Sequence, residues 1–218
     1  MELAKNQEHI VAIEGYGEGG MGVARIDGRV VFVHGALRGE TCRVLILKTL
    51  KSVAFAKVLE VIEPSGARME SDCPYFPRCG GCTYRHMSYE EELRLKKQRV
   101  QDNLARIGGS AVVVEEILGA ADTLRYRNKA QYPVAEQDGK AVCGFYSRRS
   151  HHVCDHTDCA LQPAVFKAIA DEIMAYVNKR KIKAYNEETG SGLLRHIYLR
   201  RGEHSGEIMV CLVITDLK

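Results

Sequence analysis

The sequence predicts a mixed α+β protein, in which a small β-barrel precedes a cysteine-rich loop and an α/β part. Three observations lead to this fold class. Short β-branched runs separated by tight turns fill residues 9–62, and three cysteines crowd into residues 73–82. From residue 88 onward, amphipathic helical patterns alternate with strand patterns.

The first part of the chain predicts five strands. Their number and spacing within residues 9–62 are typical of a small barrel of the oligonucleotide/oligosaccharide-binding type. Asp27-Gly28 between two runs predicts a hairpin, and Pro64-Ser65-Gly66 ends the unit. The glycines at 15–20 match G-x-G-x-x-G, but a hairpin pattern follows where a dinucleotide-binding motif needs a helix. We therefore expect a flexible loop there and no dinucleotide site.

The later part of the chain predicts two helices and several strands. Ser88-Tyr89-Glu90-Glu91 forms a capping box that begins a helix, and Gly108-Gly109 ends it. A second helix should run from about Pro163 to Lys179. One apolar face is expected on each helix: Leu93, Val100, Leu104 and Ile107 on the first, and Phe166, Ile169, Ile173 and Val177 on the second. Strand-like runs occupy 111–118, 125–134, 140–146, 193–202 and 206–215.

These patterns divide the chain into a barrel at 1–63, a cysteine loop at 64–87 and a central α/β domain at 88–218. The sequence ends directly after an apolar strand, so we expect the central domain to be incomplete.

Composition excludes several classes of protein. Of 218 residues, 45% are hydrophobic and 27% charged, which is typical of soluble globular proteins. The N-terminus has no apolar signal segment and no run is long enough to cross a bilayer, so we expect a cytoplasmic protein with no membrane partner. Because thiols stay reduced in the cytoplasm, a disulfide framework does not account for the eight cysteines.

Positive charge is concentrated in two windows. The net charge is only +3, but residues 125–152 sum to +4 and residues 178–201 to +5, which leaves −6 for the rest. Such clustering indicates a polyanionic partner, although solvated loops and helix ends could also produce it.

The decapeptide CPYFPRCGGC places Cys73, Cys79 and Cys82 within metal-binding reach of one another. Zinc sites usually combine two C-x2–4-C pairs, and only Cys79 and Cys82 have that spacing. Three ligands from one loop and a fourth from a distant segment suit an iron–sulfur cluster, so the spacing favours a cluster and leaves zinc open. Cys42, Cys143 and Cys211 lie in strand-like runs and are expected to be buried, whereas Cys154 and Cys159 lie in a polar loop where a fourth ligand could sit.

At this point the chain resembles a known family, the bacterial RNA uracil-5-methyltransferases that carry an iron–sulfur cluster and act on 23S ribosomal RNA. The resemblance rests on C-x5-C-G-G-C at Cys73–Cys82, on Gly144-Phe145-Tyr146 with Ser150-His151, and on Cys159-Ala160-Leu161-Gln162. LRYRNKAQYPV and GLLRHIYLRRG look like strands of the family's central domain. The match covers essentially the whole chain.

The resemblance implies a TRAM domain at the barrel and a [4Fe-4S] cluster held by Cys73, Cys79, Cys82 and Cys159. Cys154 is an additional thiol. The family uses S-adenosylmethionine, which it binds in a C-terminal doubly wound domain that also holds the nucleophile and base. No such unit and no nucleophile motif occur in this sequence, so no catalytic residue is assigned. We therefore expect the chain alone to lack the catalytic domain and to be inactive.

Two segments, residues 125–129 and 145–149, alternate cationic side chains with aromatic rings. RNA contact through phosphate pairing and base stacking requires this combination. We expect a monomer that binds 23S ribosomal RNA and no DNA. A stand-alone RNA-binding iron–sulfur protein and a redox- or iron-sensing RNA-binding module are alternatives. The residues predicted to contact RNA are Arg125, Tyr126, Arg127, Lys129, Phe145, Arg148 and Arg149.

Overall fold

The computed structural model describes residues 3–216, and they form two compact units. The first consists of residues 3–72 and 83–119, and the second of residues 73–82 and 120–216. This division differs from the expected boundary at residue 88. The first helix belongs with the barrel, and the cysteine decapeptide belongs with the second unit.

The first unit contains one curled sheet in the order β1-β5-β6-β4-β3-β2. Its apolar core contains side chains from strands near both ends of that order, among them Val11 of β1, Val44 of β5 and Ala24 of β3. The five predicted strands are present, but the prediction of five was one too low, because Gly15 and Tyr16 pair with β3 as a short additional strand. The bounds are β1 (Glu8–Ala12), β2 (Gly15–Tyr16), β3 (Gly22–Ile26), β4 (Arg29–His34), β5 (Thr41–Thr49) and β6 (Val53–Glu63).

One local prediction in this unit is confirmed, and a second is confirmed only in part. Asp27 and Gly28 both have positive φ and join β3 to β4, as a tight hairpin requires. The flexible loop predicted at 15–20 is present only in part, because Gly15 and Tyr16 form β2 and the 3₁₀ turn (Glu18–Gly20) lies within this segment before β3 begins.

The helix α1 (Tyr89–Arg106) begins as predicted, because the Ser88 hydroxyl accepts a hydrogen bond from the Glu91 backbone N–H at 3.3 Å. Its predicted apolar face is right only in part, since Leu93 and Leu104 are half-buried. Leu95 is the buried apolar residue, packed with Leu37 and Met87, whereas Val100 and Ile107 are exposed.

The run at 111–118 forms no strand. Its backbone is bound by side chains of α1, since Gln101 donates to the Val112 carbonyl at 3.0 Å and accepts from the Val114 N–H at 2.7 Å. These bonds take the place of a partner strand.

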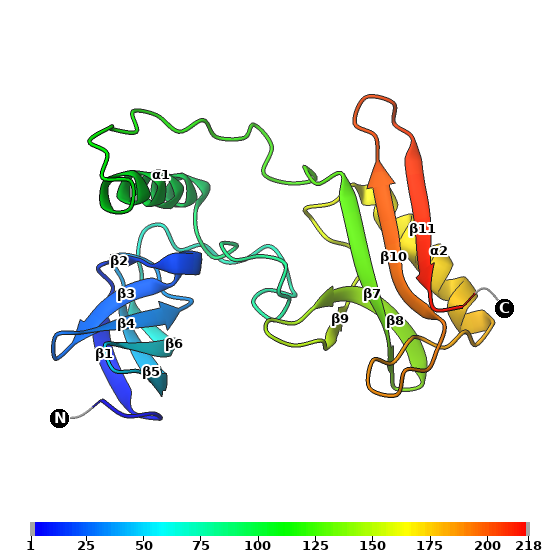
Figure 1. Cartoon of the computed structure of the whole chain (residues 1–218), viewed down its shortest axis with the longest axis horizontal. Helices are drawn as coiled ribbons and strands as arrows, with labels where there is room; N and C mark the ends of the chain where they lie inside the picture. Colours follow the sequence, from blue (N-terminus) through cyan, green and yellow to red (C-terminus); the bar gives the residue numbers. More distant parts are fainter. Residues whose placement is uncertain (1–2, 217–218) are drawn as a thin grey trace. The chain divides into compact units, whose positions relative to one another are not determined.

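The second unit is an antiparallel sheet in the order β11-β10-β7-β8-β9, with α2 packed on one face (Figure 1). Its core joins Phe166, Ala170 and Val177 of α2 to Tyr132 and Ile197 of the sheet. The short strand β9 was not predicted. The bounds are β7 (Lys129–Gln137), β8 (Lys140–Tyr146), β9 (Val153–Asp155), α2 (Ala164–Lys179), β10 (Leu194–Arg201) and β11 (Ile208–Ile214). Between residues 3 and 216, neither α-helix is long and apolar enough to span a membrane.

Candidate functional site

The decapeptide 73–82 packs against the β8–β9 edge of the second unit. Cys79 forms an isolated antiparallel bridge with Ser147, and the Gly80 N–H donates to the Tyr146 carbonyl at 2.9 Å. A side chain at Gly80 would meet that carbonyl at 2.8 Å, so glycine permits the close approach. Inside the loop, the Cys79 N–H donates to the Tyr75 carbonyl at 2.8 Å.

A second segment brings Cys154 and Cys159 to this loop. Cys154 lies on β9 and is fully buried, with its Sγ 3.1 Å from the Ser147 hydroxyl. Cys159 lies in the turn before α2, where its carbonyl accepts from the Gln162 N–H at 3.0 Å.

The electrostatics of Cys79 reflect the crowding of these thiols. Burial raises the pKa of the Cys79 thiol, and charges on Cys154, Cys159 and Cys73 raise it further, against a lowering hydrogen bond from Gly81. A bound metal would reverse the effect by favouring the thiolates.

Two arginines hold the backbones of these cysteine segments. Arg125 Nη1 donates to the carbonyls of Cys159 and Gln162, both at 2.9 Å. Arg148 donates to the Cys82 carbonyl, and its guanidinium lies 5.8 Å from the centre of the Phe76 ring. Both loops thus receive a charge-assisted hydrogen bond at a cysteine.

The imidazole of His156 lies between the loop and the sheet. It stacks on Tyr75 with centroids 4.1 Å apart and planes 16° apart, and it contacts Phe145 at 5.3 Å. The side chain is buried, and neither ring nitrogen has a hydrogen-bond partner in the described structure. Burial lowers the pKa of His156, which favours the neutral ring.

The cysteines of the two segments are the side chains that could hold a metal centre at this site. Among residues 3–216, no three His, Cys, Asp or Glu side chains are grouped tightly enough to hold one metal ion. A four-iron cluster is wider, and it takes thiolates spread over a larger space. Such a cluster would take the crowded thiols as ligands, and its sulfur atoms would offer a hydrogen-bond partner to the buried imidazole.

The other cysteines differ in their environment. Cys42 and Cys143 are buried, as expected for small apolar residues. The prediction that Cys211 is buried is wrong, because it lies on the exposed edge strand β11. Cys154 was expected in a polar loop, but it is a buried strand residue.

The structure gives three of the predicted RNA contacts partners within the second unit. Arg125 and Arg148 bind the cysteine segments, and Phe145 packs on Tyr132 at 5.2 Å. Tyr126 is 59% exposed, and Arg127 is half-buried. Lys129 and Arg149 are exposed.

The sheet face opposite α2 carries a further group of polar side chains. Lys129 lies opposite Arg200 in the β7–β10 register, and Gln131 lies opposite Tyr198. Alternation along the strands puts these residues on the face away from the core residues Tyr132 and Ile197. Sequence reasoning missed Tyr198 and Arg200, although period-2 alternation in LLRHIYLRRG could have separated them from the core positions.

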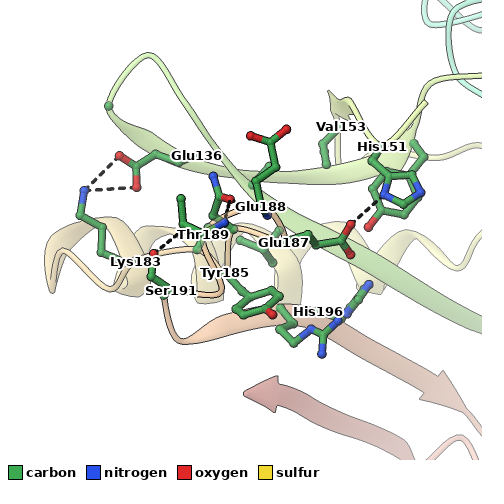
Figure 2. A pocket seen from close by; sticks show the side chains of 18 of the residues that line it. Glu136, His151, Val153, Lys183, Tyr185, Glu187, Glu188, Thr189, Ser191 and His196 are labelled. Atoms are coloured by element: carbon green, nitrogen blue, oxygen red, sulfur yellow. Dashed lines mark hydrogen bonds and ion pairs between the residues drawn. The ribbon is translucent and has the colours of Figure 1, made fainter. Parts of the chain in front are cut away.

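A pocket of about 1040 Å³ lies elsewhere on this unit, between β7, β8 and the loop before β10 (Figure 2). His151 contacts Glu187 at 2.8 Å, Lys183 contacts Glu136 at 3.0 Å, and the Arg195 guanidinium lies 4.5 Å from the centre of the Tyr185 ring. The pocket is lined by more acidic than basic residues, so it does not favour phosphate.

Comparison with known proteins shows what this architecture resembles. The family model described as "TRAM domain" matches residues 4–59 of this chain. A Clostridium tetani protein named "Uncharacterized RNA methyltransferase" is 40% identical over 99% of this chain and 47% of its own length. A protein of the same description from Halalkalibacterium halodurans is 41% identical over 96% of this chain and 46% of its own length.

A solved structure shares the fold. The Pyrococcus abyssi tRNA (uracil-54, C5)-methyltransferase in complex with S-adenosyl-L-homocysteine superposes with a TM-score of 0.70 at 20% identity. The superposition covers 96% of this chain and 46% of the other. Residues 4–59 therefore resemble a TRAM domain, and the whole chain is similar to proteins named RNA methyltransferases, of whose length it spans about half.

Two predictions are corrected by these comparisons. The fold class was defined partly by a missing catalytic domain, and inactivity was inferred from that absence. Both are contradicted, because 96–99% of the chain aligns with RNA methyltransferases and shares the fold of a solved one. The error lay in taking the end of the sequence as a property of the protein.

Proposed function

We propose that the chain belongs to an S-adenosylmethionine-dependent RNA uracil-5-methyltransferase that acts on 23S ribosomal RNA in the cytoplasm. Within this enzyme, the residues described here bind RNA and hold a [4Fe-4S] cluster. Homology to RNA methyltransferases along the chain supports the activity. The observation that carries the finer proposal is that the decapeptide, bridged to Ser147 through Cys79, lies beside the segment 154–159, whose two cysteines act on the Cys79 thiol.

We assign cluster ligation to Cys73, Cys79, Cys82 and Cys159. Cys159 is half-buried in a turn whose carbonyl is held by Arg125, whereas Cys154 is packed inside β9 against Ser147. A cluster ligand needs an accessible sulfur atom and a backbone held in place by hydrogen bonds, and Cys159 meets this condition better than Cys154. When bound, the cluster would link the decapeptide to the segment before α2 and supply a redox-active centre.

Methylation of RNA at uracil C5 requires several groups besides the cluster, and these requirements suggest what the other residues of the chain do. The reaction needs a nucleophile that adds to C6, a methyl donor and a base that removes the C5 proton. The target base must also leave its stack to be reached. Surfaces that bind phosphate and stack unpaired bases help to hold RNA in that opened state.

We assign this RNA-holding role to a surface defined by Tyr126, Lys129, Tyr198 and Arg200. Lys129 and Arg200 lie side by side and supply charge, while Tyr126 and Tyr198 supply rings. Arg149 and Arg127 extend the basic character of the unit. Arg125, Arg148 and Phe145, by contrast, are engaged by the cysteine site or the core.

The activity is tested with the full-length protein, labelled S-adenosylmethionine and unmodified 23S ribosomal RNA, with tRNA as a parallel substrate. We expect label in 5-methyluridine of 23S RNA. Label in tRNA alone would contradict the ribosomal substrate. RNA binding without any transfer would favour the stand-alone RNA-binding alternative, and RNA affinity that changes on oxidation would favour the sensing module.

The RNA surface is tested by salt dependence of binding. The double substitution Lys129→Ala and Arg200→Ala should reduce the slope of log affinity against log salt by about two phosphate contacts. The control is Lys140→Ala with Lys181→Ala, which removes the same charge from elsewhere on the unit. An equal effect of both pairs would show a general charge effect and contradict the assigned surface.

A further inference from the structure

His156 is a polar side chain that the second unit buries without satisfying. It is only 6% exposed, and both Nδ1 and Nε2 lack a hydrogen-bond partner among the described residues. A neutral imidazole carries one N–H donor and one acceptor, and leaving both unmade in the interior is costly. Such a group calls for an explanation in function.

The ring cannot rotate freely to find a partner. Tyr75 stacks on it at 4.1 Å with an angle of 16°, and Phe145 packs on it at 5.3 Å. Its backbone N–H is fixed by the Cys143 carbonyl at 3.1 Å. The orientation of the ring is therefore set by packing rather than by hydrogen bonding.

The surroundings of His156 belong to the cysteine site. It lies between Cys154 and Cys159 in the sequence, and the Tyr75 ring that covers it comes from the decapeptide. The charged groups that act on the ring are Asp155, Arg78 and Asp158. None of them hydrogen-bonds to a ring nitrogen, so these charges do not explain why the imidazole is retained.

We propose that His156 donates its ring N–H to a sulfur atom of the iron–sulfur cluster at this site. The inference rests on the cluster of the proposed function and adds a fifth side chain to its four cysteines. Hydrogen bonds to cluster sulfurs stabilise the reduced form and raise the reduction potential. His156 is thus a positioning and tuning residue rather than a ligand.

The test uses full-length protein prepared without oxygen, as wild type and as His156→Phe. Phenylalanine keeps an aromatic ring stacked on Tyr75 and removes only the ring nitrogens. We expect about four irons per chain in both proteins, a more negative reduction potential in the variant, and cluster loss in air several-fold faster. His204→Phe, at an exposed turn of the same unit, is the control and should match wild type.

A second measurement reads the hydrogen bond directly. Pulsed electron paramagnetic resonance of the reduced wild type should show coupling to an exchangeable proton that His156→Phe lacks and His156→Asn partly restores. A fully loaded His156→Phe protein with unchanged potential and coupling would overturn the proposal. Folded His156→Phe protein without iron would also overturn it, because the ring would then be a ligand. Wild type without iron would instead refute the cluster itself.

Discussion

Replacing Arg125 by asparagine separates a structural role of this arginine from a role in RNA contact. Arg125 has a φ of 56°, in the left-handed region, which asparagine tolerates better than most residues. The substitution therefore keeps the backbone and removes the bonds to the Cys159 and Gln162 carbonyls, both 2.9 Å long. We expect the second unit to be destabilised.

The magnitude follows from the lost bonds. Two hydrogen bonds contribute about 1 kcal/mol each to the free energy of unfolding. The 3.4 Å contact with Asp158 is exposed on both sides and adds at most about 0.5 kcal/mol. Relief of backbone strain at a positive φ returns about 0.5 kcal/mol. The net loss is therefore about 2 kcal/mol.

Urea unfolding of the second unit, followed with iron content, measures this loss. Lys181→Asn is the matched control, because Lys181 has a φ of 54° in the same unit and also carries one positive charge. The control should lie within about 0.5 kcal/mol of wild type. The structural role of Arg125 would be refuted if both variants were equally stable, and weaker RNA binding at full stability would restore the original RNA assignment.

Three further predictions concern other parts of the chain. A side chain at Gly144 would lie 1.8 Å from the Cys154 carbonyl, so Gly144→Ala should break the β8–β9 pairing and lose most of the bound iron. The control Gly139→Ala strains a backbone with a φ of 76° but meets no neighbouring atom, so it should keep the iron. Glu40 is buried, which raises its pKa, but hydrogen bonds from Arg68 and the Leu37 N–H outweigh burial and lower the pKa overall. The first unit should therefore lose stability as pH falls below about 4.5 and through the lowered pKa of Glu40. The variant Glu40→Gln should be less stable than wild type at neutral pH, and its stability should change less with pH in acid. Thermal unfolding across pH 2–7 measures both effects. Cys154→Ser should retain the iron of the wild type, because we assign Cys154 no ligand role, and a colourless protein would contradict that assignment.

Much of the fold could be predicted because its signals are local. The strand runs of the first unit, the Asp27-Gly28 hairpin and the Ser88 cap each depend on neighbouring residues, and all appear where expected. The run at 111–118 shows the limit. Its β-branched residues have strand propensity, but Gln101 of the preceding helix α1 binds their backbone.

The candidate site could be predicted only in part. The spacing of Cys73, Cys79 and Cys82 is a linear pattern, and the sequence contains it. The unpartnered state of His156 depends on packing by Tyr75 and Phe145, which no linear pattern encodes. The direction of the Arg125 side chain likewise depends on where the turn before α2 lies.

The most direct test of the account is the metal content of the protein prepared and purified without oxygen. We predict about four irons and a matching amount of acid-labile sulfide per chain, with both lost in Cys159→Ser and kept in Cys154→Ser. Stoichiometric zinc, or iron that depends on Cys154 and is indifferent to Cys159, would contradict it.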